Sequence, residues 1–418
     1  MRRVQLTFAL LMTVSATLAS AQQPAAPAPI ELVQLSPQLY RASVDTDFVP
    51  SNLVASVGED GILVVDPGGA QTAGALAVTL ERLPAGPARI VVDTHGHTDH
   101  TAGNGLWGER GVVIAQAEVR RELSSGPTLL LDLPSDALPT ITFSDRLTLH
   151  FNGEEIRLEH MPGSHSPSDT VVTFVGAKLV CLGGLVYADQ FPYLSVRRGG
   201  TPDGLVRNLD AILAAAPAGA TFVPGHGRDL GAADLQAYRA MVLETQSVIE
   251  KAIAAGQDAA ALKDSGALAA WKPWERPFLD TGGWVDMLIA ARNPPPADDR
   301  PSVIDALYPS LKSGDVTAAL ARYRELKRGA AADYAFTEGA LNAVGYYLLG
   351  KGRVDDAIAV FELNVEEYPQ GFNTYDSLAE GHMKRGDREQ AIRFYRMSLE
   401  LNPANQNAVA KLKELGAS

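Results

Sequence analysis

Three of the eight histidines in the chain, His95, His97 and His100, lie within six residues of one another. They follow the apolar segment 89–93, which we predict to be a strand, and Asp99 lies among them. On an extended loop His95 and His97 project to the same side, while Asp99 and His100 come where the chain can turn into a helix. Imidazole and carboxylate groups are suitable ligands for Zn²⁺. The segment therefore predicts a loop that serves two neighbouring metal positions.

Two further histidines occupy equivalent places far along the chain. His165 lies in Gly163-Ser164-His165-Ser166 and His226 lies in Pro224-Gly225-His226-Gly227, each in a glycine-containing loop after a predicted strand. His160, at the end of the preceding strand, is the alternative ligand to His165.

This pattern resembles the metallo-β-lactamase superfamily over roughly residues 31–235. The resemblance rests on the His-x-His-x-Asp-His segment, on the distant His165 before a serine-rich turn, and on the late Pro-Gly-His-Gly. Asp66, in Val65-Asp66-Pro67-Gly68, is similar to the early aspartate of the family, which buttresses the metal loop. The resemblance implies an α/β fold, a four-layer αβ/βα sandwich with a dinuclear metal centre at one edge of two facing sheets.

The resemblance also implies the roles of individual residues. One Zn²⁺ would be held by His95, His97 and His165, and a second by Asp99, His100 and His226. Asp99 would in addition be catalytic, because it would orient the attacking hydroxide and pass its proton on. The expected cofactor is thus Zn²⁺, two ions per chain.

One position departs from the family pattern. Many hydrolases of the superfamily carry a metal-bridging aspartate after a Gly-Gly pair, and here Leu185 follows Gly183-Gly184. Asp189 has the wrong spacing to replace it, and Cys181 precedes the glycines and is interpreted as a core residue. The six-ligand set without a bridging aspartate resembles the third subclass of metallo-β-lactamases.

The function that we expect is a secreted zinc hydrolase in which a metal-bound hydroxide attacks the carbonyl of an amide or lactam. Two alternatives remain open: an ester or lactone hydrolase of the same superfamily, or a repeat-based interaction protein with a degenerate metal domain. Arg197 and Arg198 are candidate substrate-binding residues, because a guanidinium can hold a substrate carboxylate through two parallel hydrogen bonds.

Alternating strands and helices must position these residues. We predict hairpins of 54–57 with 62–65 and of 147–151 with 156–158, the latter across Asn152-Gly153, a strong hairpin signal. Further strands are predicted at 89–93, 112–115, 170–175, 178–183 and 221–223, and helices at 71–83, 116–123, 203–215 and 232–255. This interleaving favours sheets covered by helices.

The chain divides into three parts. Residues 1–21 are typical of a secretory signal peptide, with two arginines, an apolar run and Ala19-Ser20-Ala21. Residues 22–296 are predicted to form the hydrolase domain and 297–418 a helical tetratricopeptide-repeat domain. The repeats are clearest over 334–404, where residues recur at an offset of 34, as in Gly352 and Gly386. We expect 22–296 to fold and to hydrolyse substrate without the repeats.

Charge and composition limit the partners. The formal net charge is −13, which disfavours nucleic acid as a ligand, and a single cysteine excludes a disulfide framework. We expect a small-molecule substrate, a possible protein or peptide partner for the repeats, no membrane span after signal cleavage, and a secreted, periplasmic location.

Overall fold

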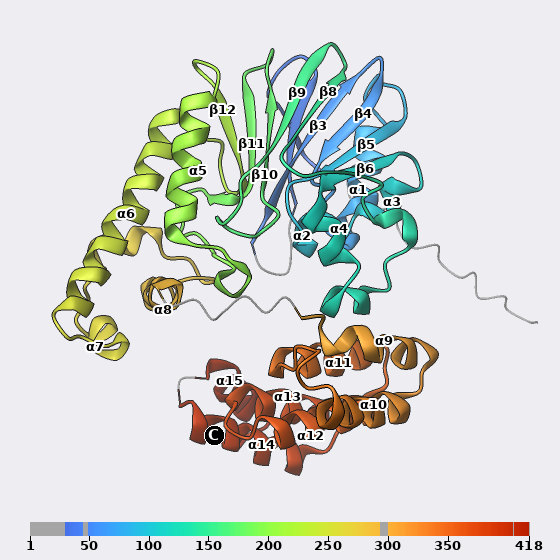
Figure 1. The fold of residues 1–418 in the computed structure, drawn as a ribbon, viewed down its shortest axis with the longest axis vertical. Coiled ribbons are helices and arrows are strands. Elements are labelled where there is room, and N and C mark those ends of the chain that lie inside the picture. Colours follow the sequence, from blue (N-terminus) through green and yellow to red (C-terminus); the bar gives the residue numbers. More distant parts are fainter. Residues whose placement is uncertain (1–29, 45–48, 293–299, 404, 418) are drawn as a thin grey trace, which may run out of the picture.

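The computed structural model describes residues 30–44, 49–292, 300–403 and 405–417. The predicted signal peptide and the predicted boundary between 296 and 297 lie outside the described residues. Up to residue 292 strands and helices alternate, and from residue 300 onward every named element is a helix (Figure 1). Within the described chain no helix combines the length and the apolar character that crossing a membrane requires.

The strands are arranged in two halves that meet at one point. In the described residues their order is β7-β6-β5-β4-β3-β12-β11-β10-β9-β8, with β1 and β2 continuing beside β3. Strands β3 and β12 pair only through Ser51 and His226. The strands are β1 (Leu32–Gln34), β2 (Leu39–Val44), β3 (Ser51–Gly58), β4 (Gly61–Val65), β5 (Ala88–Asp93), β6 (Val112–Gln116), β7 (Ile141–Phe143), β8 (Arg146–Phe151), β9 (Glu154–His160), β10 (Thr170–Phe174), β11 (Leu179–Tyr187) and β12 (Thr221–His226).

The two halves face each other across a shared apolar core. One buried cluster joins Leu63 and Val92 of the first half to Leu158, Phe174 and other side chains of the second half. Helices cover both outer faces (Figure 1). The first face packs against α1 (Ala70–Leu80) and α3 (Asn104–Gly108), and the second against α5 (Pro202–Ala215), α6 (Ala232–Ala254) and α8 (Thr281–Arg292). The predicted four-layer sandwich is therefore confirmed.

Local sequence explains several of these elements. β4 and β5 are parallel neighbours between the helices and the second half, and each contains an apolar run, Ile62–Val65 in β4 and Ile90–Val92 in β5. The β8–β9 turn has Asn152 and Gly153 at φ +52° and +75°, as a two-residue hairpin turn requires. Both predicted hairpins are confirmed, with strands that extend beyond the predicted ranges. The predicted ranges missed β1, β2 and β7.

Shorter elements link the strands and the longer helices. These are α2 (Thr98–Thr101), α4 (Ala117–Leu123), α7 (Ala259–Asp264) and the 3₁₀ turns η1 (Gly126–Leu131), η2 (Ser135–Ala137), η3 (Val196–Arg198) and η4 (Ala269–Trp274). In Figure 1, α2 and α4 lie at the edge of the sheets that faces the C-terminal helices.

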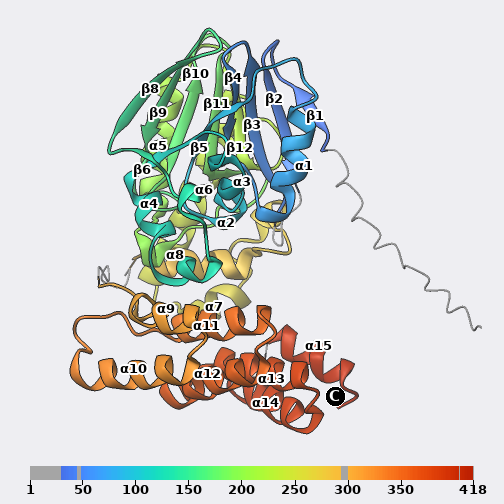
Figure 2. The ribbon, with the colours of Figure 1, turned by 90° about the vertical axis from the view of Figure 1, so that its right-hand side faces the viewer.

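The C-terminal part consists of stacked helical hairpins (Figure 2). Gly314, Gly352 and Gly386 lie between paired helices at φ of +73° to +85°, a left-handed conformation that glycine adopts without a steric cost. The offset of 34 residues thus corresponds to one helical hairpin. The helices are α9 (Val303–Ser313), α10 (Val316–Gly329), α11 (Glu338–Gly350), α12 (Val354–Glu367), α13 (Phe372–Arg385), α14 (Arg388–Leu401) and α15 (Gln406–Glu414).

Candidate metal centre

The loop after β5 carries the histidine cluster. His95 and His100 are almost fully buried, and His97 is the residue that precedes helix α2. Gly96 lies between His95 and His97, and a Cβ atom at this position would collide with the carboxylate of Glu122 from α4. Only glycine fits here without displacing Glu122, so the tight packing of α4 on the loop holds the two flanking histidines in place.

Asp66 buttresses this loop from the end of β4. Its Oδ1 accepts a hydrogen bond from the Thr94 amide at 2.8 Å, and its Oδ2 accepts one from the Thr94 hydroxyl at 2.8 Å. The same Oδ2 lies 2.9 Å from Nδ1 of His100. Asp66 has a φ of +60°, uncommon for a residue with a side chain, and these three contacts hold it there.

All six histidine and aspartate residues proposed as ligands come together in two groups. Within each group, one potential ligand atom per residue lies within 4.8 Å of the others. The groups are His95, His97 and His165, and Asp99, His100 and His226, and these six residues together are called the metal cluster below. The alternative ligand His160 lies outside both groups, and its Nε2 is 2.8 Å from the carbonyl oxygen of Pro167.

Four of the five histidines are oriented through Nδ1. The Nδ1 atoms of His95, His100, His165 and His226 lie 2.6–3.1 Å from oxygen atoms of Thr94, Asp66, Tyr193 and Pro50, respectively. Such contacts to the far ring nitrogen fix the orientation of metal-binding histidines. The buried Nε2 atom of His95 has no hydrogen-bond partner in the described residues, and that of His100 lies 3.2 Å from Oδ2 of Asp99. This donor set fits divalent metal ions.

The pKa values of the first group favour neutral imidazoles. Burial, together with neighbouring histidines, lowers the pKa of His95 and of His165 well below the usual value. The pKa of His97 is lowered to about 4, mainly by burial, and Arg198 contributes. Neutral imidazole is the form that binds a metal ion, so this group is ready to do so at neutral pH.

The second group is organised around the Asp99 carboxylate. Its Oδ2 accepts a hydrogen bond from Ser51 at 2.7 Å and lies 3.2 Å from Nε2 of His100. Burial opposes ionisation of Asp99, but His100, His226 and Ser51 outweigh it and lower its pKa below the usual range. The pKa of His226 is lowered to about 4, mainly by burial. Asp99 is therefore a carboxylate at neutral pH.

Leu185, at the sequence position of the bridging aspartate of many superfamily hydrolases, packs in the apolar core. Leu182 and Leu185 both pack in the cluster that faces α5 and α6, although residues three apart on a regular strand face opposite sides. Gly183, at φ +51°, breaks the alternation and shifts the pairing register. The side chain of Leu185 therefore lies in the helix-facing core.

Tyr187 is the residue of β11 that reaches the metal cluster. Its ring stacks on that of His226 with centroids 4.3 Å apart, and it lies 5.9 Å from the ring of His165. Asp189 instead forms two hydrogen bonds with Arg228, at 2.8 and 2.9 Å, and is half exposed. Cys181 is buried in the core, as predicted. A strand pattern cannot identify Tyr187, because the pairing register of β11 shifts twice, before Gly183 and between Gly183 and Tyr187, and so changes which residues share a face.

A pocket of about 500 Å³ opens onto the cluster. His97, Asp99 and His226 form its floor, and its walls are largely apolar. The wall residues include Val49, Pro127, Leu131, Tyr187, Tyr193 and Phe278. Leu131 and Phe278 come from segments that carry no sequence motif, so no residue pattern predicted them.

The structure separates the two candidate arginines. Arg198, in η3, lines the pocket and forms an ion pair with Glu122, whose side chain is buried. Arg197 is exposed and does not line the pocket. No sequence motif pointed to Glu122, the ion-pair partner of Arg198, because its position depends on the packing of α4 over Gly96.

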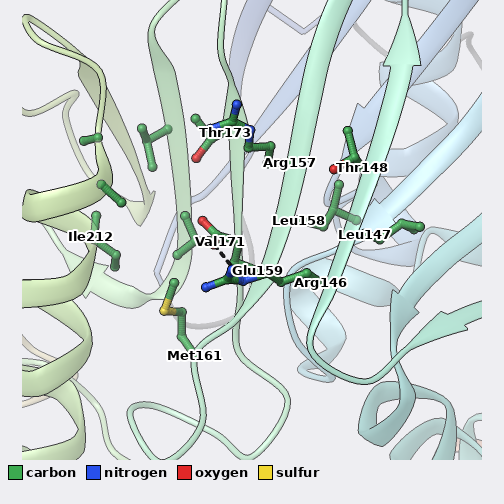
Figure 3. Close-up of a pocket in the computed structure, with 13 residues that line it drawn as sticks. Arg146, Leu147, Thr148, Arg157, Leu158, Glu159, Met161, Val171, Thr173 and Ile212 are labelled. Carbon is green, nitrogen blue, oxygen red and sulfur yellow. Dashed lines mark ion pairs between the residues drawn. The ribbon is translucent and has the colours of Figure 1, made fainter.

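A second hollow, of about 460 Å³, lies between α5 and strands β8 to β10 (Figure 3). Arg146 and Glu159 form an ion pair there at 3.2 Å, and the side chain of Arg146 is 80% exposed. None of the residues predicted for the site lines this hollow, so the metal cluster is the candidate functional site.

Comparison with known proteins gives a family match for the first domain. The family model described as "Metallo-beta-lactamase superfamily" matches residues 44–231. No curated protein aligns significantly with the chain. Similar solved structures include a metallo-beta-lactamase from Pontibacter korlensis, 18% identical, which covers 51% of this chain and 99% of its own, with a TM-score of 0.44. DIM-1 metallo-beta-lactamase is 18% identical over 52% of this chain and 98% of its own, also with a TM-score of 0.44.

Proposed function

Because residues 44–231 form a metallo-β-lactamase superfamily domain, we propose that the protein is a secreted hydrolase with two Zn²⁺ ions per chain that cleaves an amide or lactam bond. The observation that carries this proposal is the pair of three-residue groups, in which oxygen atoms orient four of the five histidines through Nδ1 and the buried Nε2 of His95 has no hydrogen-bond partner among the described residues. Bound divalent ions would lower the pKa of water and polarise a substrate carbonyl.

The Asp99 carboxylate has the position and the charge of a proton carrier. It lies at the pocket floor and stays ionised at neutral pH, because His100, His226 and Ser51 stabilise the charged form. We infer that Asp99 accepts the proton of the attacking water and delivers it to the leaving atom. Ser51 and His100 hold its Oδ2 and so orient the carboxylate.

Charge supports carbonyl chemistry at this site. Asp99 is the single carboxylate among the six proposed ligands, so the protein supplies one negative charge for two divalent ions. Lewis acidity is stronger where less of the ionic charge is neutralised. Tyr187 lies beside His226, where it adds a neutral aromatic ring in place of a second carboxylate.

The pocket walls favour a substrate that carries a carboxylate beside an apolar group. Arg198 supplies the positive charge near His97, while Tyr193, Phe278 and Leu131 supply apolar surface. A lactam or an N-acyl amino acid combines these two features, whereas simple esters and lactones lack the carboxylate. This distinction is the reason to place amides and lactams first.

The location and the repeat partner are also part of the proposal. The pattern of residues 1–21 supports secretion to the periplasm. The helical hairpins that recur at 34 residues support a tetratricopeptide-type domain that takes a protein or peptide partner.

Metal analysis of the purified mature protein, combined with a substrate panel, tests the function. We expect close to two zinc ions per chain and chelator-sensitive hydrolysis of a lactam or N-acyl amino acid, above that of an ester, a lactone and a phosphodiester. A protein that hydrolyses none of these when fully loaded, or that hydrolyses them equally well after complete removal of metal, would contradict the proposal.

A further inference from the structure

The C-terminal helices contact the segment that forms one wall of the pocket. Turn η1, which follows α4, lies against α9 and α11 (Figures 1 and 2). The amide of Gly126, at the start of this turn, donates a hydrogen bond to the Asp305 carboxylate of α9. The pocket is therefore bounded on this side by a segment that rests on the C-terminal helices.

Two adjacent leucines in this segment serve different parts of the molecule. Leu130 is 8% exposed and belongs to the apolar core of the C-terminal helices, together with Val303, Leu307 and Leu341. Leu131 lines the pocket above the metal cluster and is 46% exposed. Because consecutive residues share one backbone, a shift of Leu130 in the helical core moves Leu131 in the pocket wall.

Asp132 ends the segment and is held by α9 and α11. The hydroxyl of Tyr308 donates a hydrogen bond to its Oδ1 at 2.7 Å, and that of Tyr347 donates one to its Oδ2 at 3.3 Å. Lys351 lies 3.0 Å from the same Oδ2. Burial opposes ionisation of Asp132, but these partners outweigh it and lower its pKa. Its φ of +50° is uncommon for a residue other than glycine, and these contacts hold that conformation.

We propose that helices α9 and α11 position the pocket wall, and that Tyr308 and Tyr347 act through Asp132 and Leu131 to determine which substrates fit the site. The proposal rests on the function proposed above and adds that the C-terminal domain is part of the specificity apparatus. It also changes the expectation that 22–296 works alone, since such a fragment would leave Leu130 without its apolar surroundings.

A double variant, Tyr308→Phe with Tyr347→Phe, tests the proposal in the full-length chain. It keeps both aromatic rings and removes only the two hydroxyl groups that contact Asp132. Tyr346→Phe is the matched control, because the hydroxyl of Tyr346 donates to Glu380 within the C-terminal helices instead. Circular dichroism and thermal melting confirm that each variant is folded.

Hydrogen exchange provides a readout that does not depend on activity. We expect amides in 126–132 to exchange at least about fivefold faster in the double variant than in the wild type or in Tyr346→Phe, because local opening becomes easier. Unchanged exchange in this segment would overturn the proposal, whatever the protein hydrolyses.

Ligand size provides the second readout, in protein loaded with Co²⁺ and followed by its visible absorption. Mercaptoacetate and 2-mercapto-3-phenylpropanoate carry the same thiol and carboxylate but differ in bulk. We expect the double variant to bind the phenyl compound about 3- to 10-fold more weakly and mercaptoacetate unchanged, because only the larger ligand reaches the apolar wall. Equal weakening of both, or of neither, would overturn the proposal. A wild-type protein that takes up no Co²⁺ would contradict the proposed function, while the exchange result would still decide the role of the tyrosines.

Discussion

Replacing Arg198 with alanine tests how the pocket distinguishes its substrates. Arg198 is the cationic side chain among the described residues that line the pocket, and it lies close enough to His97 to help lower the pKa of that histidine. If its guanidinium holds a substrate carboxylate, the variant should bind carboxylated substrates less well and neutral substrates as before.

The expected magnitude follows from the surroundings of the guanidinium. A hydrogen bond to a charged group contributes about 1.5–3 kcal/mol, and about 1.4 kcal/mol corresponds to a tenfold change in affinity. The side chain of Arg198 is 41% exposed and already pairs with Glu122, so water and Glu122 both compete with the substrate. We therefore expect the lower end, a rise in KM of roughly 10- to 30-fold.

Two further variants make the interpretation specific. Arg197→Ala removes the same charge one residue earlier, at an exposed position outside the pocket, and should leave KM unchanged. Glu122→Gln keeps the shape of the side chain that packs over Gly96 but removes the competing negative charge. It should lower KM for carboxylated substrates, the opposite direction to Arg198→Ala.

The assay is steady-state hydrolysis of a β-lactam with a free carboxylate and of its methyl ester, which present the same scissile bond. KM for the free acid should rise in Arg198→Ala and that for the methyl ester should not. The reasoning would be refuted if both compounds lost affinity equally, or if Arg197→Ala reproduced the effect.

Three other predictions concern the metal cluster. His97→Ala should lose bound metal and activity together, as measured by metal analysis and turnover, and a metal-free but fully active variant would exclude a metallohydrolase. Asp99→Asn keeps the shape but loses the charge, so turnover should fall at least ~100-fold, as is typical of positioned acid–base groups, and unchanged turnover would remove Asp99 from the mechanism. In the metal-free protein, burial of His100 lowers its pKa, but the charges of Asp99 and Asp66 outweigh the effect of burial and raise this pKa from 6.5 to about 10. The resulting stabilisation of the folded state is complete below pH 6.5 and is lost as the pH approaches 10, so Tm should fall between pH 7 and 10. The fall should be smaller in Asp66→Asn. Parallel curves of Tm against pH for the wild type and this variant would contradict the assignment to His100.

Local spacing decided much of what the sequence could predict. The proposed ligands His95, His97, Asp99 and His100 lie within six residues, so covalent geometry alone brings their side chains to one loop. The Asn152-Gly153 turn is a second such case, because its left-handed backbone depends on the two residue types themselves. The helical hairpins that repeat at 34 residues likewise depend on spacing within a short segment.

Only the tertiary structure decided what surrounds the metal cluster. Tyr187 reaches it because the pairing of β11 with β12 shifts register both before Gly183 and between Gly183 and Tyr187, and no residue pattern in the strand records these shifts. Glu122 meets Gly96, and Leu130 enters the core of the C-terminal helices, through packing between segments that are far apart in the chain. Such contacts depend on how whole elements pack, and no local residue pattern records them. The sequence therefore determined which residues can bind metal, whereas long-range packing decided which residues form the walls of the pocket above them.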